Sequence, residues 1–357
     1  LSGATNATIR DGRGIATIGA NDAVAVSQPR IDIRDMVVGE NDGYVDVVIS
    51  LSAPGQNLVT VNFATSNGTA YYHTTTTDSV SDNGTLTFGP GETTKVVRIE
   101  LREDGNTEPL EHFRVNLSSA TNAVIGNDSA MISVVDNDST VDTPGLYVRD
   151  AVVDEKAGTA TFVVMLGGPQ GQSSNNVVAV NYATGVGTAI AGSDFVATTG
   201  TLVFAAGESV KTVTVDIADD GLPEGLERIN LTLSSAVNAT IVDGRAVAEV
   251  GASDRAAVAL PTVQVAATQV SEADGYVDVV LSLSAPALGP VSVGYSTSNN
   301  SAVYHTTDND YVYESGTVRF AAGETTQVVR IEINNTATIE SFETFYFNLH
   351  SANGVTI

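Results

Sequence analysis

The chain has 357 residues, enough for two or three domains, and contains no cysteine, so neither a disulfide nor a thiol contributes to its fold or chemistry. Its formal charge of −26 argues against nucleic acid and anionic membrane surfaces as partners. Charged residues make up only 16% of the chain, so the acids must be concentrated in a few places. No apolar run is long enough to cross a bilayer, and we expect no membrane insertion in this segment.

The chain repeats itself at a spacing of 116 residues, since GTLTF, GTLVF and GTVRF begin at Gly84, Gly200 and Gly316. The chain also has a longer period of 232 residues, because ENDGYVDVVISLSAP from Glu40 recurs as EADGYVDVVLSLSAP from Glu272. Two repeat types therefore alternate. The expected parts are the tail of a preceding, truncated repeat over 1–22, a type A repeat over 30–138, a type B repeat over 146–254, and a type A repeat over 262–357 whose last strand is missing.

Within the first full repeat, short segments of alternating apolar and polar residues are separated by clusters of Gly, Pro, Asn and Asp. This alternation predicts β-strands, and no segment shows a sustained helical period. The expected strands, in chain order, cover 31–38, 44–51, 58–65, 84–88, 94–101, 112–118 and 130–136. About seven strands in a repeat of this length predict an all-β fold, with tandem immunoglobulin-like β-sandwiches in a linear array.

The acidic residues of this repeat fall in every second connection and at the exit of the last strand. If successive strands run up and down the sandwich, these acids all lie at one end of it. They are Glu40, Asp78, Glu103, Asp104, Glu108, Glu111, Asp136 and Asp138. Carboxylates crowded in this way repel one another, and Ca²⁺, which takes six to eight oxygen ligands, suits the set better than Mg²⁺ does. The alternative is a solvated acidic rim that only keeps the protein soluble.

The order of these motifs resembles the Calx-β repeat: V-x-E, then GTA with an acid and an aromatic residue, GTLTF, GET, a spaced acidic cluster and an acidic tail. The resemblance implies a seven-strand sandwich that binds calcium at one end. The ligands it implies in the second repeat are Glu155, Asp194, Asp219, Asp220, Glu224, Glu227 and Asp254. The acidic tail of that repeat thins to Ala252, Ser253 and Asp254, so we expect fewer ions there.

The third repeat departs further from the pattern, because Asn335 and Thr336 stand where the other repeats have an acid pair. We therefore expect a weak or lost site, although four acids remain, namely Glu272, Asp310, Glu340 and Glu343.

The resemblance implies a calcium-binding structural segment of a large extracellular or cell-surface protein of bacterial type, such as an adhesin shaft, stalk or surface filament. Calcium would stiffen the junctions between neighbouring repeats of the chain. Two alternatives stay open: a calcium-sensing regulatory module, and a filament whose copies complete one another by strand donation. We do not expect an enzyme, because nucleophile-elbow, phosphate-loop and zinc-protease motifs are absent from the sequence.

Overall fold

A computed structural model describes six stretches of the chain: 23–70, 79–219, 225–251, 254–304, 309–335 and 342–357. The tail predicted over 1–22 lies outside these stretches, as do four of the predicted metal ligands, namely Asp78, Asp220, Glu224 and Glu340.

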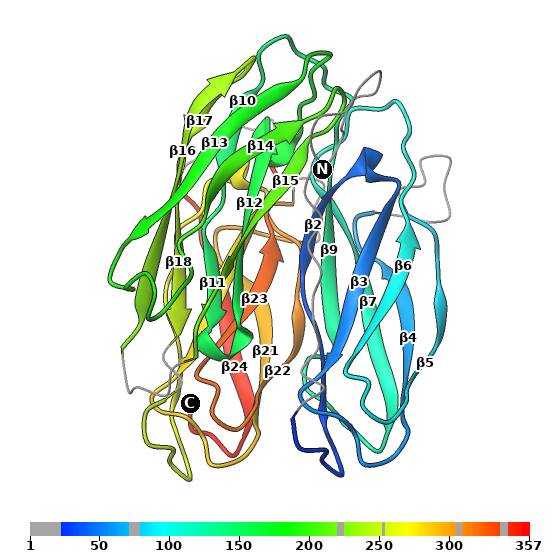
Figure 1. Ribbon diagram of the computed structural model, residues 1–357, viewed down its shortest axis with the longest axis vertical. Helices are drawn as coiled ribbons and strands as arrows, with labels where there is room; N and C mark the ends of the chain where they lie inside the picture. Colours follow the sequence, from blue (N-terminus) through cyan, green and yellow to red (C-terminus); the bar gives the residue numbers. More distant parts are fainter. Residues whose placement is uncertain (1–22, 71–78, 220–224, 252–253, 305–308, 336–341) are drawn as a thin grey trace. The chain divides into compact units, whose positions relative to one another are not determined.

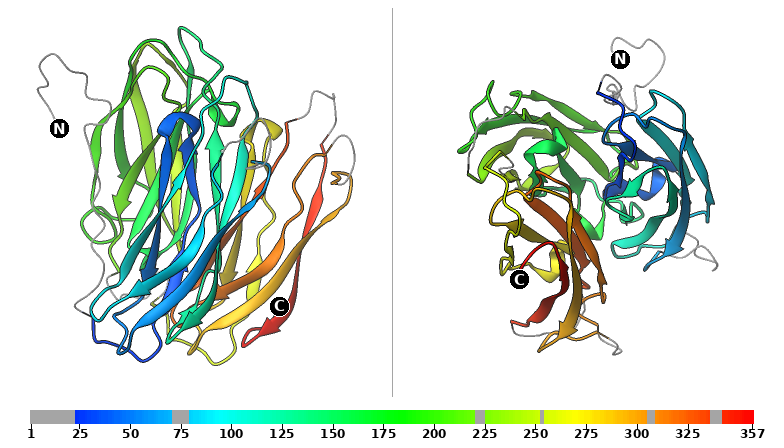
Figure 2. Two further views of the ribbon diagram at one scale, coloured as in Figure 1. Left: turned by 90° about the vertical axis from the view of Figure 1, so that its right-hand side faces the viewer. Right: turned by 90° about the horizontal axis from the view of Figure 1, so that it is seen from below.

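Nine strands and one short 3₁₀ helix make up the described part of the first repeat. Their bounds are β1 (Arg30–Ile33), β2 (Met36–Gly39), η1 (Glu40–Asp42), β3 (Tyr44–Leu51), β4 (Val59–Asn67), β5 (Asn83–Phe88), β6 (Thr94–Glu100), β7 (Glu111–Thr121), β8 (Val124–Ile125) and β9 (Ser129–Val135). The strands form two sheets, with the orders β6-β3-β1-β8 and β2-β9-β7-β4-β5. The two sheets face each other as a sandwich (Figures 1 and 2).

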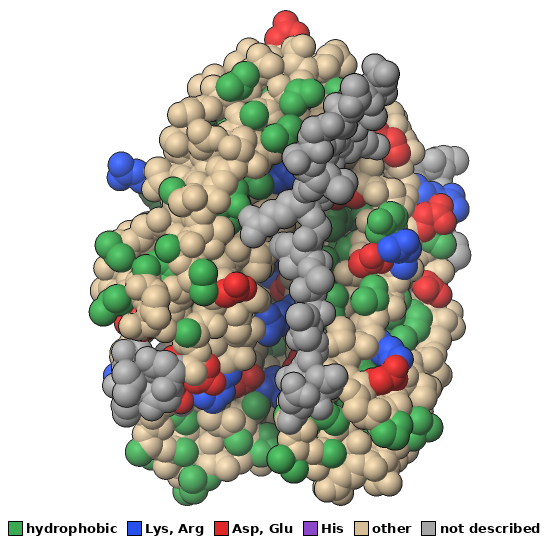
Figure 3. Space-filling model, in the orientation of Figure 1, with side chains coloured by type: hydrophobic (Ala, Val, Ile, Leu, Met, Phe, Trp, Pro, Cys, Tyr) green, Lys and Arg blue, Asp and Glu red, His purple; other side chains and the backbone are tan. Residues whose placement is uncertain are grey.

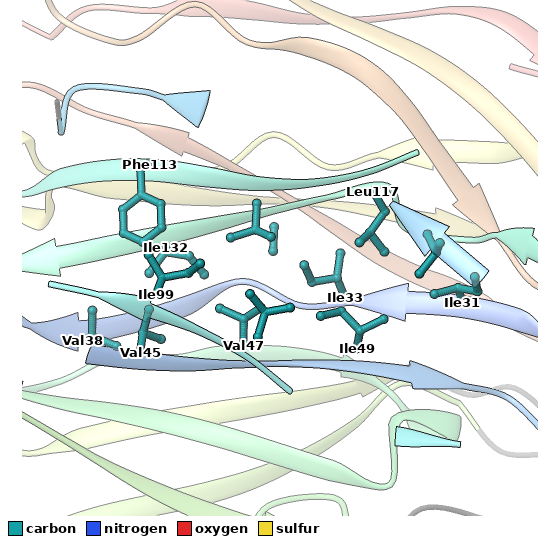
Figure 4. Close-up of a cluster of buried hydrophobic side chains, with 14 of the residues drawn as sticks. Ile31, Ile33, Val38, Val45, Val47, Ile49, Ile99, Phe113, Leu117 and Ile132 are labelled. Carbon is teal, nitrogen blue, oxygen red and sulfur yellow. The ribbon is translucent and has the colours of Figure 1, made fainter. Parts of the chain in front are cut away.

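The core of this sandwich lies between its two sheets. Alternate residues of β3, namely Val45, Val47 and Ile49, are buried, as the alternation in the sequence predicts. They pack in one cluster with Phe113 and Leu117 from β7 of the opposite sheet (Figure 4). Burial of each such side chain contributes about 1.5–3 kcal/mol, and this core holds the loops at the end of the sandwich in place.

The prediction of a single strand over 31–38 is wrong, because this segment divides between the two sheets. β1 pairs with β3, whereas β2 runs parallel to β9 in the other sheet. The chain crosses between the sheets at Arg34 and Asp35, which carry no apolar side chain to bury. Asp35 stabilises the crossing, since its Oδ1 accepts a hydrogen bond from the Met131 N–H of β9 at 2.8 Å.

The second repeat has the same plan, again with nine strands in the described residues. Its elements are β10 (Gly145–Val148), β11 (Ala151–Asp154), η2 (Glu155–Ala157), β12 (Thr159–Leu166), η3 (Gly168–Gln170), β13 (Val178–Val186), β14 (Thr199–Phe204), β15 (Val210–Asp216), β16 (Glu227–Val237), β17 (Thr240–Asp243) and β18 (Arg245–Gly251). The sheet orders are β15-β12-β10-β17 and β11-β18-β16-β13-β14. Asp150 stabilises the crossing between the sheets as Asp35 does in the first repeat, since its Oδ1 accepts a hydrogen bond from the Val247 N–H at 2.8 Å.

The third repeat has two smaller sheets in the part of the chain that is described. Its elements are β19 (Val263–Val265), η4 (Glu272–Asp274), β20 (Tyr276–Leu283), β21 (Val291–Asn299), β22 (Ser315–Phe320), β23 (Thr326–Glu332) and β24 (Phe345–Asn353). The sheet orders are β19-β20-β23 and β22-β21-β24. The core includes Leu281, Val293, Phe320 and Ile331.

These three repeats confirm the prediction of an all-β chain of tandem sandwiches. Every helix in the described residues is a 3₁₀ turn of three residues, and none is long and apolar enough to cross a membrane. Charged side chains are sparse on the face shown in Figure 3, where uncharged side chains and backbone form most of the described surface.

Candidate metal centre

The turn η1 places the first candidate ligand of the first repeat. It follows β2 directly, and the Asp42 side chain fixes its start by accepting a hydrogen bond from the Gly39 N–H at 2.9 Å. Gly43 ends the turn with a φ of 76°, a left-handed conformation that glycine adopts without strain. The carboxyl group of Glu40 is thereby held at the end of the sandwich, where the residue is only 3% exposed.

Four further acids meet Glu40 there. Asp104 and Glu108 come from the connection between β6 and β7, and Asp136 and Asp138 come directly after β9. Glu40, Asp136 and Asp138 each offer an oxygen within 4.8 Å of the others, and so do Glu40, Asp104 and Glu108. We call these five residues the first-repeat cluster. Glu40 belongs to both groups and is therefore its centre.

Only some of the side-chain oxygens in and next to the first-repeat cluster accept hydrogen bonds. Glu40 Oε1 accepts the Asp104 N–H at 3.1 Å, and Asp104 Oδ1 accepts the Asn106 N–H at 2.7 Å. The remaining atoms are buried without a hydrogen-bond partner, namely Glu40 Oε2, Asn41 Oδ1, Asp104 Oδ2, Asp136 Oδ1 and Oδ2, Asn137 Oδ1 and Asp138 Oδ2. Buried polar atoms in native proteins nearly always have a partner, and five of these seven are carboxylate oxygens of the first-repeat cluster, so a cation bound there would satisfy them.

Electrostatics gives the same indication. Burial, together with the charges of Glu103, Asp136 and Asp138, raises the pKa of Glu40 to about 8, although the Asp104 N–H lowers it in part. Burial is also the main cause that raises the pKa of Asp136 to about 6. Nearby backbone N–H groups lower the Asp136 pKa in part, but none has hydrogen-bond geometry to its carboxylate oxygens. The ionised cluster is therefore unfavourable by itself, and a cation would favour it.

These residues fit Ca²⁺. All the unpaired atoms are oxygens, both from carboxylates and from the amides of Asn41 and Asn137, which is the mixed set that Ca²⁺ takes. They also differ from a solvated rim, because Glu40 and Asp136 are each 3% exposed. The two amides were missed in the sequence, although both lie next to predicted ligands, which is the signal that could have found them.

Two other predicted ligands of the first repeat lie outside the cluster as defined. Glu103 adjoins it, since Glu103 Oε1 accepts a hydrogen bond from Asn137 Nδ2 at 3.1 Å, and burial raises its pKa. Glu111 is half-buried at the start of β7 and belongs to neither group of three acids.

The second repeat brings together fewer of its predicted ligands. Glu155, on the turn η2, is 6% exposed and forms a group with Asp219 and Asp254, whose offered oxygens lie within 4.8 Å of one another. We call these three residues the second-repeat cluster. Separately, Glu155, Asp194 and Glu227 line a small pocket. Asp194 also has a structural role, because its Oδ2 accepts a hydrogen bond from the Ile190 N–H at 2.5 Å.

A lysine lies among the acids of the second-repeat cluster, and sequence reasoning missed it. Lys156 Nζ is 3.2 Å from Asp254 Oδ1 and 3.6 Å from Asp219 Oδ1. Burial lowers the pKa of Lys156, but the hydrogen bond to Asp254 and the charges of Asp219 and Asp254 outweigh this, and the net pKa is raised. The signal in the sequence is a basic residue directly after Glu155, where the first repeat has Asn41.

The third repeat shows no group of three potential metal ligands in its described residues. Glu272 begins the turn η4, and Glu343 lies just before β24. Asp310 is 9% exposed, and its Oδ2 accepts a hydrogen bond from the Val303 N–H at 2.6 Å. These three acids therefore stay predicted ligands that the structure does not bring together.

Comparisons with known proteins show which families and structures this chain resembles. The model of the Calx-β domain matches the chain three times, over 22–139, 136–256 and 254–356. The mouse (Mus musculus) extracellular matrix organizing protein FRAS1 is 30% identical over 339 residues, which are 89% of this chain and 8% of that protein. Bovine (Bos taurus) sodium/calcium exchanger 1 is 31% identical over 202 residues, 51% of this chain and 20% of the exchanger. A crystal structure described as calcium binding domain CBD12 of CALX1.1 is 23% identical, with a TM-score of 0.30, over 58% of this chain and 79% of that one.

Proposed function

Because this chain belongs to the Calx-β family, we propose that it is a calcium-binding structural segment of a long extracellular protein. The observation that carries this proposal is the set of seven buried, unpaired oxygens at one end of the first repeat. The extracellular location in this proposal is supported by the mouse relative, which is an extracellular matrix organizing protein. The chain spans 8% of that relative and 20% of the bovine exchanger, so the activity and partners of the whole protein are part of the proposal.

The residues that would hold calcium come from three separate parts of the first repeat. Glu40 lies on the turn between β2 and β3, Asp104 and Glu108 lie between β6 and β7, and Asp136 and Asp138 begin the connection to the second repeat. Calcium supplies the positive charge that these carboxylates lack. A ligand shared by all three parts would fix the start of the connection against two loops, and we propose that this stiffens the junction.

The test is a calorimetric titration of the full chain with CaCl₂, together with thermal unfolding in calcium and in EDTA. We expect dissociation constants of about 10⁻⁴–10⁻³ M, as for other extracellular modules. Calcium should then raise the free energy of unfolding by about 2.7 kcal/mol per site at a hundredfold excess over Kd. No heat of binding and no change in melting temperature would contradict the proposal.

A second candidate function is a calcium-sensing module, and the similarity to sodium/calcium exchanger 1 favours it. A sensor requires micromolar affinity and a change of shape on binding, whereas a structural segment requires neither. Small-angle scattering in EDTA and in calcium, combined with the titration, separates the two. Sedimentation velocity tests the remaining alternative. An adhesin shaft or stalk would stay monomeric, whereas a filament subunit would sediment as larger species.

A further inference from the structure

The turn η2 fixes the position of Lys156. Asp154 caps this turn, since its side chain accepts a hydrogen bond from the Lys156 N–H at 3.1 Å. Gly158 closes the turn with a φ of 70°. The residue before Lys156 is Glu155, a member of the second-repeat cluster, so the ammonium group and one of the candidate ligands are carried by the same short turn.

The ammonium group of Lys156 lies where a cation would be needed. Its distances of 3.2 Å to Asp254 Oδ1 and 3.6 Å to Asp219 Oδ1 join two of the three acids of the cluster. The Asp254 side chain is 14% exposed, so one end of this ion pair is largely withdrawn from water. Ion pairs of this kind are screened less than pairs on the open surface.

The first repeat has no lysine at the position that corresponds to Lys156. The position after Glu40 is Asn41, a neutral residue, and Asp136 of the first repeat corresponds to Ala252 of the second. One gained ammonium and one lost carboxylate make the second repeat more positive by two charges at these positions. The unpaired oxygens follow this difference, because seven lie in the first repeat and one, Asp254 Oδ2, lies in the described part of the second.

We propose that the ammonium group of Lys156 is a tethered counter-ion that takes the place of one calcium ion in the second repeat. This inference rests on the proposed calcium-binding function. The second repeat thereby holds its acids together at calcium concentrations that leave the first-repeat cluster empty. The first and second repeats then differ in their calcium requirement, the first being calcium-dependent and the second partly calcium-independent.

The second repeat has another possible ion position, which Lys156 does not occupy. The pocket lined by Glu155, Asp194 and Glu227 does not include Lys156 among its lining residues. The inference therefore concerns one ion position, between Asp219 and Asp254, and leaves calcium binding at the other acids of the repeat intact.

The experiment compares the full chain with its Lys156→Gln variant by equilibrium dialysis against millimolar CaCl₂ and by melting in EDTA. We expect the variant to bind about one more calcium ion per chain, or to bind at that position at least about tenfold more tightly, since ligand charge tunes affinity. In EDTA the variant should melt about 4 °C lower, as expected for a loss near 1 kcal/mol in a repeat of about 110 residues. Lys211→Gln is the matched control, because it removes the same charge from β15 outside the cluster.

Four further variants assign the effect to the charge of Lys156. Lys156→Arg keeps a cation and should bind no additional calcium. In Lys156→Gln combined with Asp254→Asn, the additional ion should be lost again. Asn41→Lys should weaken calcium binding by the first repeat more than Asn41→Ala does. Both variants lose the Asn41 amide and its 2.6 Å hydrogen bond from Nδ2 to the Gly207 carbonyl, so the difference between them measures the added charge.

The outcomes separate this inference from the function on which it rests. Calcium binding by the unsubstituted chain, with no gain in Lys156→Gln, would overturn the inference and leave the proposed function standing. A gain of the same size in Lys211→Gln would also overturn it, since the effect would then be one of net charge. If neither the unsubstituted chain nor any variant binds calcium, the proposed function is wrong and the inference falls with it.

Discussion

In the first repeat, Glu40, Asp136 and Asp138 bring buried carboxylates together without any basic side chain among their hydrogen-bond partners in the described residues. In the second repeat, Lys156 lies between Asp219 and Asp254. The strands that carry the two clusters are paired alike, with β2 parallel to β9 in one repeat and β11 parallel to β18 in the other. The comparison teaches that one framework can present either an uncompensated or a partly neutralised set of carboxylates, depending on a few loop residues.

Calcium removal should have the largest effect and should act unequally on the two repeats. In EDTA, we expect amide hydrogen exchange to increase most at 103–108 and 136–138, because those backbones carry the acids whose repulsion is then uncompensated. Amides around Glu155 and Asp254 should change less. At a hundredfold excess over Kd, calcium contributes about 2.7 kcal/mol per occupied site, which sets the scale of the loss. Equal changes in both repeats, measured by mass spectrometry, would contradict the comparison.

Glu40→Gln should weaken calcium binding by the first repeat about a hundredfold, because Glu40 belongs to both groups of acids there. Calorimetric titration measures this change. Glu155→Gln is the matched variant of the second repeat, and its effect should be smaller, since Lys156 already neutralises part of that cluster. If the two substitutions weaken binding equally, the clusters are not as different as their contacts indicate.

The calcium-free chain should also lose stability as pH rises. The pKa of Glu40 is raised to about 8 in the folded chain, against an ordinary value of 4.5. Between these values the folded state binds more protons than the unfolded state, so the free energy of unfolding should fall as pH rises from about 4.5 to 8. Melting temperatures of the full chain in EDTA across this interval measure the slope. Glu40→Gln should flatten it, and an unchanged slope in that variant would assign the dependence to other groups.

Substitution of the crossing aspartates should have the smallest effect and should be the same in both repeats. Asp35→Ala and Asp150→Ala each remove a 2.8 Å hydrogen bond from a strand N–H to a carboxylate, and each should cost about 1 kcal/mol. Urea unfolding of the two variants gives the comparison. A large difference between them would mean that the frameworks themselves differ, and the contrast between the clusters could then not be assigned to Lys156.

The sequence predicted the strands well where one face of a strand is buried. The segment 44–51 was predicted with the bounds that β3 has, because its apolar residues alternate without interruption. The segment 31–38 was predicted as one strand although it forms two. A crossing between sheets depends on which partner each half meets, and the pairing of β2 with β9 joins residues far apart in the chain.

The candidate site was predicted by the same kind of reasoning, and residue type did not reveal how each side chain is placed. Alternation of strand direction placed the acids of the first repeat at one end, and five of them do meet there. Residue type alone could not distinguish Glu40, which is buried at the centre, from Glu111, which belongs to neither group. Nor could it show that Lys156 turns toward the acids, since the direction of a long side chain depends on the capped turn that carries it.

The parallel pairing of β2 with β9 also has a mechanical consequence. The chain enters the first repeat through β1 and β2 and leaves it at the end of β9. When tension acts between that entry and that exit, the two strands are pulled along their length in opposite directions. The hydrogen bonds of the register from Met36–Ile132 to Gly39–Val135 are then loaded together in shear, and they do not open one after another. Asp136 is the next residue after β9, so the first-repeat cluster lies at the point where such a load would enter the sheet.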